Sequence, residues 1–239
     1  MISGIAESLI RGLIRRVRPR AADDNVDVFE QAGWAWRMGA GPMLRGAVWS
    51  LRLRGFARPV FVGRRVRIFY AGQVSAGRGV FLGDNVRVNA FSRNGVRFGE
   101  RVTIRENGWI QCSSSPSNPG DQLVIGSDVY IGPAAIIGVG GPIDIGDDCQ
   151  IGSGVTLISE NHASHPTSTD QGIEVTRAGI KLGRGCWLGH RVTILDGVTL
   201  GDQCTVGAGA VVTRSFPDGS RIAGVPARQI ASERTADRP

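Results

Sequence analysis

The sequence has few aromatic residues, no paired cysteines and no long apolar run, and each shortage argues against a class of protein. Aromatic residues make up 6% of the 239 residues, and they do not alternate with basic residues as on an RNA-binding sheet, so we expect no nucleic-acid partner. None of the four cysteines belongs to a CxxC pair, which leaves a zinc ribbon unsupported. No run of about 18 apolar residues occurs, so no transmembrane helix is predicted.

The first residues also lack an uninterrupted apolar core with a small-residue cleavage site, so we expect no cleavable signal peptide. The expected compartment is the cytoplasm, where thiols are reduced. The net charge of +7 is carried mostly by arginine. This charge leaves two anionic partners open, namely a bilayer surface and phosphorylated small molecules.

Glycine and aliphatic residues are abundant instead. The chain has 35 glycines, and 41% of its residues are hydrophobic. Because glycine costs about 1 kcal/mol at a helix-interior position, this composition disfavours a helical bundle. The apolar content is high enough for an extensive core.

Residues 1–20 have the pattern of an amphipathic helix with a basic side, because apolar residues recur at i, i+3 and i+4 spacing. Such a helix either lies on a membrane surface or packs on protein, and the spacing fits both. Residues 21–30 resemble a linker, and residues 31–58 are expected to be a short helical or irregular segment. We therefore predict an N-terminal region over 1–58, a repeat domain over 59–230 and a tail over 231–239.

From about Val62 the apolar period becomes six residues. Aliphatic residues recur every sixth position from Leu182 to Val212, and upstream units such as Ile145 and Ile151 continue the series. A column of small apolar residues lies four residues after these positions, and it includes Cys149, Cys186 and Cys204. This period fits neither an α-helix nor an alternating hairpin, and it is typical of a hexapeptide β-helix in which three hexads close one coil. We expect the aliphatic and small columns inside, and the glycine that often follows the aliphatic residue to adopt a turn conformation that other residues disfavour.

The six-residue register breaks at four places. Four extra residues follow the unit at Val88, nine follow Ile110, two follow Ile137 and nineteen follow Leu157. In a solenoid such insertions leave the coil as loops, and function concentrates there.

The largest insertion, within 160–180, contains His162 and His165, and the third histidine of the chain is His190. A neutral histidine is suited to removing a proton from a hydroxyl near neutral pH. The position of this loop in a regular repeat makes it the candidate active site, although the register alone does not choose between its two histidines.

Two segments, CWLGHRVTILDGVTLGDQCTVGAGAVVTR and AGVPARQI, resemble the hexapeptide-repeat acyltransferases, in particular the galactoside, maltose, nodulation-factor and polysaccharide O-acetyltransferases. NHASHPTSTDQGIEVTRAG is similar to the histidine loop of the polysaccharide branch. The resemblance is strong over about 124–230 and weak over 60–123. It implies an all-β, left-handed parallel β-helix, a homotrimer, and acyl-CoA bound in a groove between neighbouring subunits.

The same resemblance assigns roles to individual residues. His162 matches the catalytic base, and acetyl-CoA is the implied acyl donor for a sugar hydroxyl. The positions that match CoA contacts are His190, Ala208, Thr213, Arg214 and Arg228. Asn161 lies beside the base, Asn85 lies in the variable segment expected to shape the acceptor site, and Trp187 either walls the acyl pocket or caps a coil corner.

The expected setting is surface polysaccharide or lipopolysaccharide biosynthesis, with residues 1–20 on the inner face of the membrane if the acceptor is lipid-linked. Three other functions remain open. They are N-acylation of a nucleotide-linked amino sugar, a non-catalytic scaffold, and a metal-dependent hydratase similar to the γ-class carbonic anhydrases. The last needs three histidines on one zinc, and the spacing of the histidines here is not that family's pattern, so we expect no metal.

Overall fold

The computed structural model describes residues 30, 33, 36–52, 59–112, 117–162 and 175–230. The amphipathic pattern over 1–20 and the tail over 231–239 lie outside these residues. Among the described residues, no helix has the length and apolar character needed to cross a membrane.

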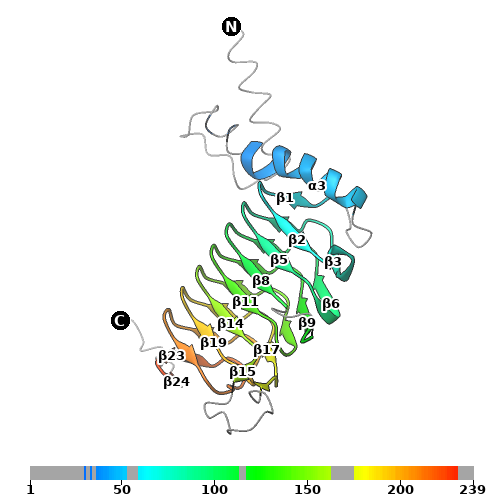
Figure 1. Cartoon of the computed structure of the whole chain (residues 1–239). Coiled ribbons are helices and arrows are strands. Elements are labelled where there is room, and N and C mark those ends of the chain that lie inside the picture. The colour runs from blue at the N-terminus through cyan, green and yellow to red at the C-terminus, as the bar shows by residue number, and fades with distance from the viewer. Residues whose placement is uncertain are drawn as a thin grey trace, which may run out of the picture.

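The described chain winds as a left-handed parallel β-helix, which confirms the expected fold class (Figure 1). Each coil contributes one short strand to each of three sheets, so the sheets form the faces of a triangular prism. The nine-stranded sheet contains β1 (Phe61–Val62), β4 (Phe81–Leu82), β7 (Thr103–Ile104), β10 (Tyr130–Ile131), β13 (Gln150–Ile151), β18 (Trp187–Leu188), β21 (Thr205–Val206), β23 (Arg221–Gly224) and β24 (Ala227–Gln229).

The other two faces have the same construction. The seven-stranded sheet contains β2 (Arg67–Phe69), β5 (Arg87–Asn89), β8 (Trp109–Gln111), β11 (Ile136–Gly138), β14 (Thr156–Ile158), β19 (Thr193–Ile194) and β22 (Val211–Val212). The six-stranded sheet contains β3 (Val74–Ala76), β6 (Ser92–Phe98), β9 (Gly120–Ile125), β12 (Ile143–Ile145), β17 (Ile180–Leu182) and β20 (Thr199–Leu200).

Both ends of the prism are covered. Helix α3 (Gly41–Arg52), preceded by the π-helical turn η1 (Trp36–Ala40), lies across the N-terminal end, and Arg45 Nε donates to the carbonyl of Val62 at 2.8 Å (Figure 1). A short 3-10 helix, η2 (Ala71–Gln73), precedes β3. At the other end β24 turns back antiparallel to β23, so it covers the parallel edge of the nine-stranded sheet.

The interior is the stacked aliphatic core that the six-residue period predicts. Ile131, Ile151, Leu188 and Val206 pair in register on successive coils and are at most 2% exposed. The small column is also buried, and it comprises Val129, Ala135, Cys149, Val155, Cys186, Val192, Val198, Cys204 and Ala210. Coils about 4.8 Å apart bring each side chain onto its counterpart in the next coil.

The expected role of the repeat glycines is wrong. Gly152, which follows Ile151, does not have a positive φ, but a Cβ built on it would lie 2.7 Å from the backbone of Gly189 in the next coil. Glycine is therefore needed there for close stacking of coils. The left-handed backbone occurs two residues later, at positions such as Gly154 and Arg191.

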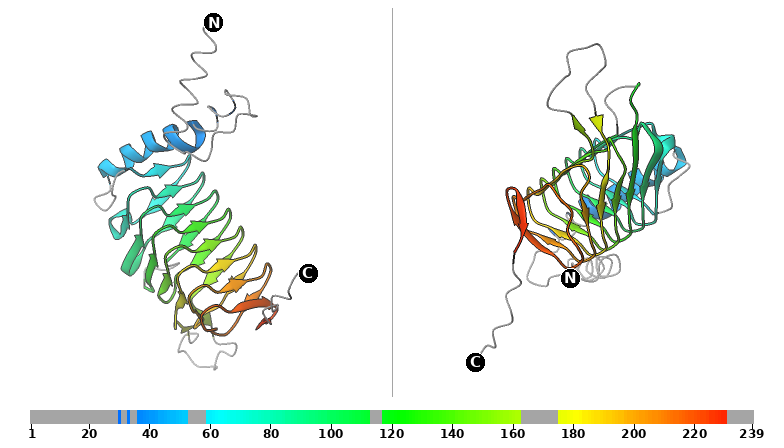
Figure 2. Two further views of the ribbon diagram at one scale, coloured as in Figure 1. Left: turned by 180° about the vertical axis from the view of Figure 1, so that it is seen from behind. Right: turned by 90° about the horizontal axis from the view of Figure 1, so that it is seen from below.

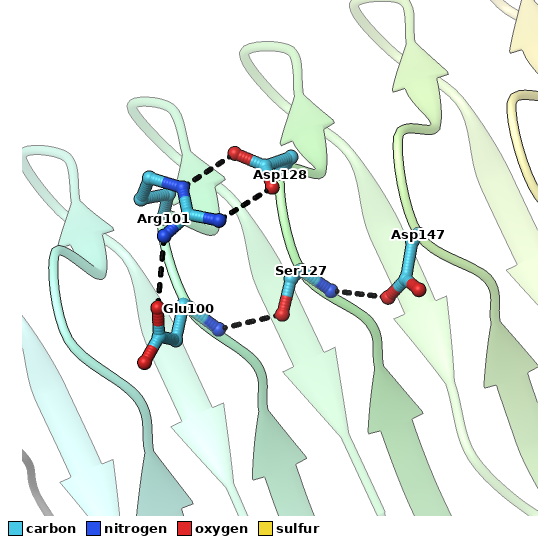
Figure 3. A network of polar contacts seen from close by, with 5 residues as sticks. All are labelled: Glu100, Arg101, Ser127, Asp128 and Asp147. Atoms are coloured by element: carbon cyan, nitrogen blue, oxygen red, sulfur yellow. Dashed lines mark hydrogen bonds and ion pairs between the residues drawn. The ribbon is translucent and has the colours of Figure 1, made fainter.

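Polar side chains link successive coils at the turns between the six- and nine-stranded sheets. Arg101 makes a two-pronged ion pair with Asp128, with N–O distances of 2.6 and 2.7 Å (Figure 3). Ser127 Oγ accepts the backbone N–H of Glu100, and Asp147 Oδ1 accepts the backbone N–H of Ser127 (Figure 3). These bonds satisfy turn N–H groups that no strand partner reaches.

The buried cysteines give a first prediction. All four are buried free thiols, and burial raises the pKa of Cys112 to about 12. Because the thiolate is the reactive form, we expect a colorimetric disulfide reagent at pH 8 to leave the native protein essentially unlabelled and to titrate four thiols after denaturation. Rapid labelling of the native protein would contradict the core assignment.

Candidate functional site

The three corners of the prism differ in character. The loop corner joins the seven- to the six-stranded sheet, the His190 corner joins the nine- to the seven-stranded sheet, and the acidic corner is the one drawn in Figure 3. All four insertions predicted from the register lie at the loop corner, because each falls between a strand of the seven-stranded sheet and the following strand of the six-stranded sheet. Loops of successive coils therefore stack along one edge.

The histidine loop leaves the loop corner after Ser159, whose buried hydroxyl donates to the carbonyl of Gly141 at 2.8 Å. Across the base of the loop, Arg177 Nη2 donates to Glu160 Oε2 at 3.2 Å, and its Nη1 donates to Asn118 Oδ1 at 2.7 Å. Asn118 belongs to the insertion after Ile110, on the same corner. The Arg177 guanidinium, at the end of the histidine loop, therefore bonds both to the start of that loop and to this neighbouring insertion.

The next coil holds the returning end of the same loop. Asp196 accepts the backbone N–H groups of Gly179 at 2.7 Å and Ala178 at 3.1 Å, and it also accepts the Thr176 hydroxyl at 3.4 Å. The residues on both sides of the histidine loop are thus bonded firmly to the coils.

His162 and Asn161 form the first strand of the loop, β15 (Asn161–His162), which pairs antiparallel with β16 (Val175–Thr176). The pair projects from the edge of the prism (Figure 2). The His162 side chain and all of His165 lie outside the described residues. The structure therefore places the backbone of His162 in the ordered stem of the loop.

The His190 corner gathers three of the predicted CoA-binding residues. His190 and Ala208 are exposed on successive coils, and Arg228 lies in β24, the last strand of the adjoining nine-stranded sheet. The backbone N–H of Ser153 donates to His190 Nδ1 at 3.2 Å, and the Ser153 hydroxyl lies 2.6 Å from the same nitrogen. With Nδ1 accepting, a neutral imidazole carries its proton on Nε2, which can serve as a donor.

The remaining predicted residues lie elsewhere. Thr213 and Arg214 are exposed at the loop corner, two coils beyond the histidine loop, with the Arg214 guanidinium 5.2 Å from the Phe216 ring centroid. Trp187 is half exposed on the outside of the nine-stranded sheet, so it does not meet the histidine loop within one chain.

Asn85 also lies at the His190 corner, four coils before His190 and therefore roughly 19 Å away along the prism. It lines a hollow of about 360 Å³ with Arg87, Asn107 and Trp109. Asn85 Nδ2 donates to Asn107 Oδ1 at 3.2 Å, and the Trp109 ring is 47% exposed. An exposed indole beside amides and a guanidinium can stack on a ring and bind hydroxyl groups.

One chain does not bring its histidine loop to its own His190 corner, because the seven-stranded sheet lies between them. From His190 to Asp196 the chain crosses this face in six residues, or at most about 20 Å. Within the described residues, no cluster of three or more His, Cys, Asp and Glu is arranged to hold a metal ion.

Sequence reasoning missed the contacts that fix the histidine loop. Arg177 and Asp196 are distant in sequence from their partners, and only the superposition of coils brings Asp196 under Gly179. The one signal was positional, since Arg177 stands near the end of the insertion, a few residues before the repeat register resumes at Leu182.

Two family models match parts of the repeat region. "Bacterial transferase hexapeptide (six repeats)" matches residues 179–214, and "Hexapeptide repeat of succinyl-transferase" matches residues 122–159. Both matches fall on coils that the structure builds from hexads, so they agree with the observed fold.

Curated proteins with related sequences include acetyltransferases. A galactoside O-acetyltransferase from Escherichia coli (strain K12) is 34% identical over 129 residues, covering 54% of this chain and 63% of the relative. A putative lipopolysaccharide biosynthesis O-acetyl transferase, WbbJ, from the same strain is 27% identical over 167 residues, covering 66% of this chain and 71% of the relative. The chain thus spans less than two thirds of the first relative's length.

Among solved structures, a variant of AntD, an N-acyltransferase from Bacillus cereus crystallised with dTDP and coenzyme A, has a TM-score of 0.51 and 18% sequence identity. The match covers 79% of this chain and 89% of that chain. At this identity the similarity concerns the fold.

Proposed function

The chain belongs to the hexapeptide-repeat transferases, and on this premise we propose that it transfers an acetyl group from acetyl-CoA to a hydroxyl of a sugar. The observation that carries the proposal is the histidine loop, which leaves an otherwise regular coil and is fixed at its base by Arg177 and Asp196. Loops positioned by a rigid scaffold often carry catalytic residues, and a general base in this loop would be attached to such a scaffold at its base.

In the proposed reaction His162 acts as the general base. It takes the proton of the acceptor hydroxyl as that oxygen attacks the thioester carbonyl carbon of acetyl-CoA. The tetrahedral oxyanion is stabilised by a hydrogen-bond donor such as a backbone N–H. The carbon–sulfur bond then breaks, and His162 returns the proton to the departing thiolate, so that the products are an acetyl ester and free CoA. Neither step needs a metal or a redox partner.

The donor is proposed to bind along the His190 corner. Ala208 is small and exposed there, and a Cβ built on the neighbouring Gly209 would meet nothing within 4 Å, so an extended pantetheine chain can lie close to the backbone. The guanidinium of Arg228, in the last strand beyond this corner, suits a CoA phosphate. Arg214 and Thr213, at the loop corner, are proposed to reach CoA bound by an adjacent subunit.

For this arrangement we propose a homotrimer, because His162 and the donor groove lie at different corners of one chain and a second copy must bring them together. The face of the seven-stranded sheet between them carries exposed apolar side chains, namely Phe69, Ile136 and Leu195, each 37–52% exposed. Packing part of this face against a second copy would cover apolar surface and bring the histidine loop of one subunit to the His190 corner of the next.

The acceptor is proposed to enter from the N-terminal side, at the hollow formed by Asn85, Asn107 and Trp109. On the same corner this hollow precedes the donor residues, so the sugar and the thioester would approach a neighbouring His162 from opposite directions. The proposed setting is glycan assembly at the cytoplasmic face of the membrane, with residues 1–20 making a peripheral membrane contact. Asn161, beside the base, is proposed to contact the same acceptor.

The test is acetyl-CoA turnover measured as free thiol, with a panel of monosaccharides, sugar phosphates and glycan fragments. We expect thiol release above the background hydrolysis rate with at least one carbohydrate acceptor. If acetyl-CoA binds but no carbohydrate raises the rate, the scaffold alternative is favoured and the proposed reaction is wrong.

A further inference from the structure

A second cavity lies at the N-terminal end of the His190 corner, beneath η1 and α3. Its volume is about 530 Å³, and Trp36 and Phe81 provide its aromatic surfaces. Its remaining side chains are mostly charged, and they comprise Arg37, Arg45, Arg64, Asp84, Arg105 and Glu106. Four guanidinium groups in one cavity attract anions, and the described residues that line it include two carboxylates.

The two carboxylates do not balance the arginines. Glu106 is committed to Arg105, with N–O distances of 3.0–3.2 Å. Asp84 Oδ1 accepts the backbone N–H of Arg64, so this carboxylate is bound to the main chain. The side chains of Arg37 and Arg64 have no hydrogen-bond or ion-pair partner among the described residues.

Arg45 is oriented for a ligand. Its Nε donates to the carbonyls of Val62 and Gly63, at 2.8 and 3.2 Å, which fixes the plane of the guanidinium. Its two Nη atoms lie 3.6 and 3.8 Å from the position of a Cβ built on Gly41, another residue of the cavity wall. A guanidinium held in this way loses little entropy when it binds a phosphate with two parallel hydrogen bonds.

The cavity adjoins the hollow proposed for the acceptor sugar. Asp84 and Glu106 line the cavity, and the residues that follow them, Asn85 and Asn107, line the hollow. The two therefore occupy the same two turns of the His190 corner. A molecule with a sugar at one end and a phosphate at the other would fill both.

We propose that this arginine cavity binds the phosphate of the acceptor, so that the sugar acetylated by this protein is carried as a phosphate ester on a nucleoside or a lipid. The inference rests on the proposed function for the sugar, but the phosphate site itself is a separate binding site. The aromatic surfaces of Trp36 and Phe81 accommodate the group that follows the phosphate, whether a nucleobase or the start of a lipid chain.

The experiment measures binding to the full chain rather than activity. Calorimetry with pyrophosphate and with a nucleoside diphosphate tests soluble ligands, and sedimentation with phosphatidylcholine vesicles, with or without an anionic phospholipid, tests a lipid phosphate. The variant is Arg37→Glu combined with Arg64→Glu. The matched control, Arg78→Glu combined with Arg184→Glu, makes the same charge change at exposed positions of the acidic corner.

We expect the cavity variant to weaken binding by about tenfold or more, the worth of one charge-assisted hydrogen bond, while the control variant binds like the wild type. Binding of the nucleoside diphosphate would identify a nucleotide carrier, and binding to anionic vesicles alone would identify a lipid carrier. Absence of all binding, or equal loss in both variants, would overturn the proposal.

Acetyl-CoA binding separates this inference from the proposed function. We expect the cavity variant to bind acetyl-CoA as the wild type does, because the donor residues lie three or more coils away. Loss of acetyl-CoA binding in that variant would mean that the cavity holds the donor, which contradicts the inference. If the wild type binds phosphate in the cavity but transfers no acetyl group, the proposed function fails and the phosphate site stands.

Discussion

Replacing His162 by alanine is expected to lower kcat for acetyl transfer by about 10²–10⁴, the usual contribution of a general base, with acetyl-CoA affinity largely unchanged. The affinity should persist because the proposed donor contacts, at the His190 corner and at Thr213 and Arg214, lie outside the histidine loop. Steady-state thiol release and acetyl-CoA calorimetry on the same preparation measure both quantities. His165→Ala is the control and should keep most of the activity.

Mixing two inactive variants tests whether the site is shared between subunits. In a cyclic trimer, chains carrying His162→Ala and chains carrying Ala208→Trp should each be inactive alone, the second because the donor groove is filled. After random mixing by denaturation and refolding, about a quarter of the interfaces pair an intact His162 with an intact Ala208. Activity should therefore return to that fraction, and no recovery would place both residues in one subunit's site.

Replacing Ile151 by aspartate is expected to prevent folding. Ile151 is 2% exposed and stacks between Ile131 and Leu188. The substitution removes about 1.5–3 kcal/mol of apolar burial and adds several kcal/mol for burying a carboxylate, against a total stability of about 5–15 kcal/mol. Circular dichroism and size-exclusion chromatography of the purified chain would detect the loss of the β-helix.

Gln150→Asp is the matched control for this substitution. Gln150 precedes Ile151 in β13 and is exposed on the outside of the same strand, so the added charge stays in water. We expect this variant to fold and melt close to the wild type. A soluble, folded Ile151→Asp protein would show that the six-residue register, and with it the assignment of inner and outer faces, is wrong.

The repeat was readable from the sequence because it is a local pattern. An aliphatic residue such as Leu188 must be interior on every coil, so its recurrence at every sixth position reports the fold directly. The reason for the glycine that follows it, close stacking of coils, could not be predicted from the sequence. The clash that excludes a side chain at Gly152 comes from Gly189, whose backbone lies in the next coil.

The candidate site was predictable only in part for the same reason. The insertion after Leu157 marked the histidine loop, and the structure places the other three insertions on the same corner. The hydrogen bonds from Arg177 to Glu160 and Asn118 depend on which loops lie side by side in the folded prism. The arginine cavity depends on α3 lying over the first coils, a packing that no spacing in the sequence encodes.

The most direct test of acetyl transfer at the histidine loop is mass spectrometry of a sugar phosphate acceptor incubated with acetyl-CoA and the protein. Wild-type protein should give a product heavier by one acetyl group, in an amount equal to the free CoA released. His162→Ala protein of the same oligomeric state should give almost none. An unmodified acceptor with the wild type, or equal product from the variant, would contradict the account.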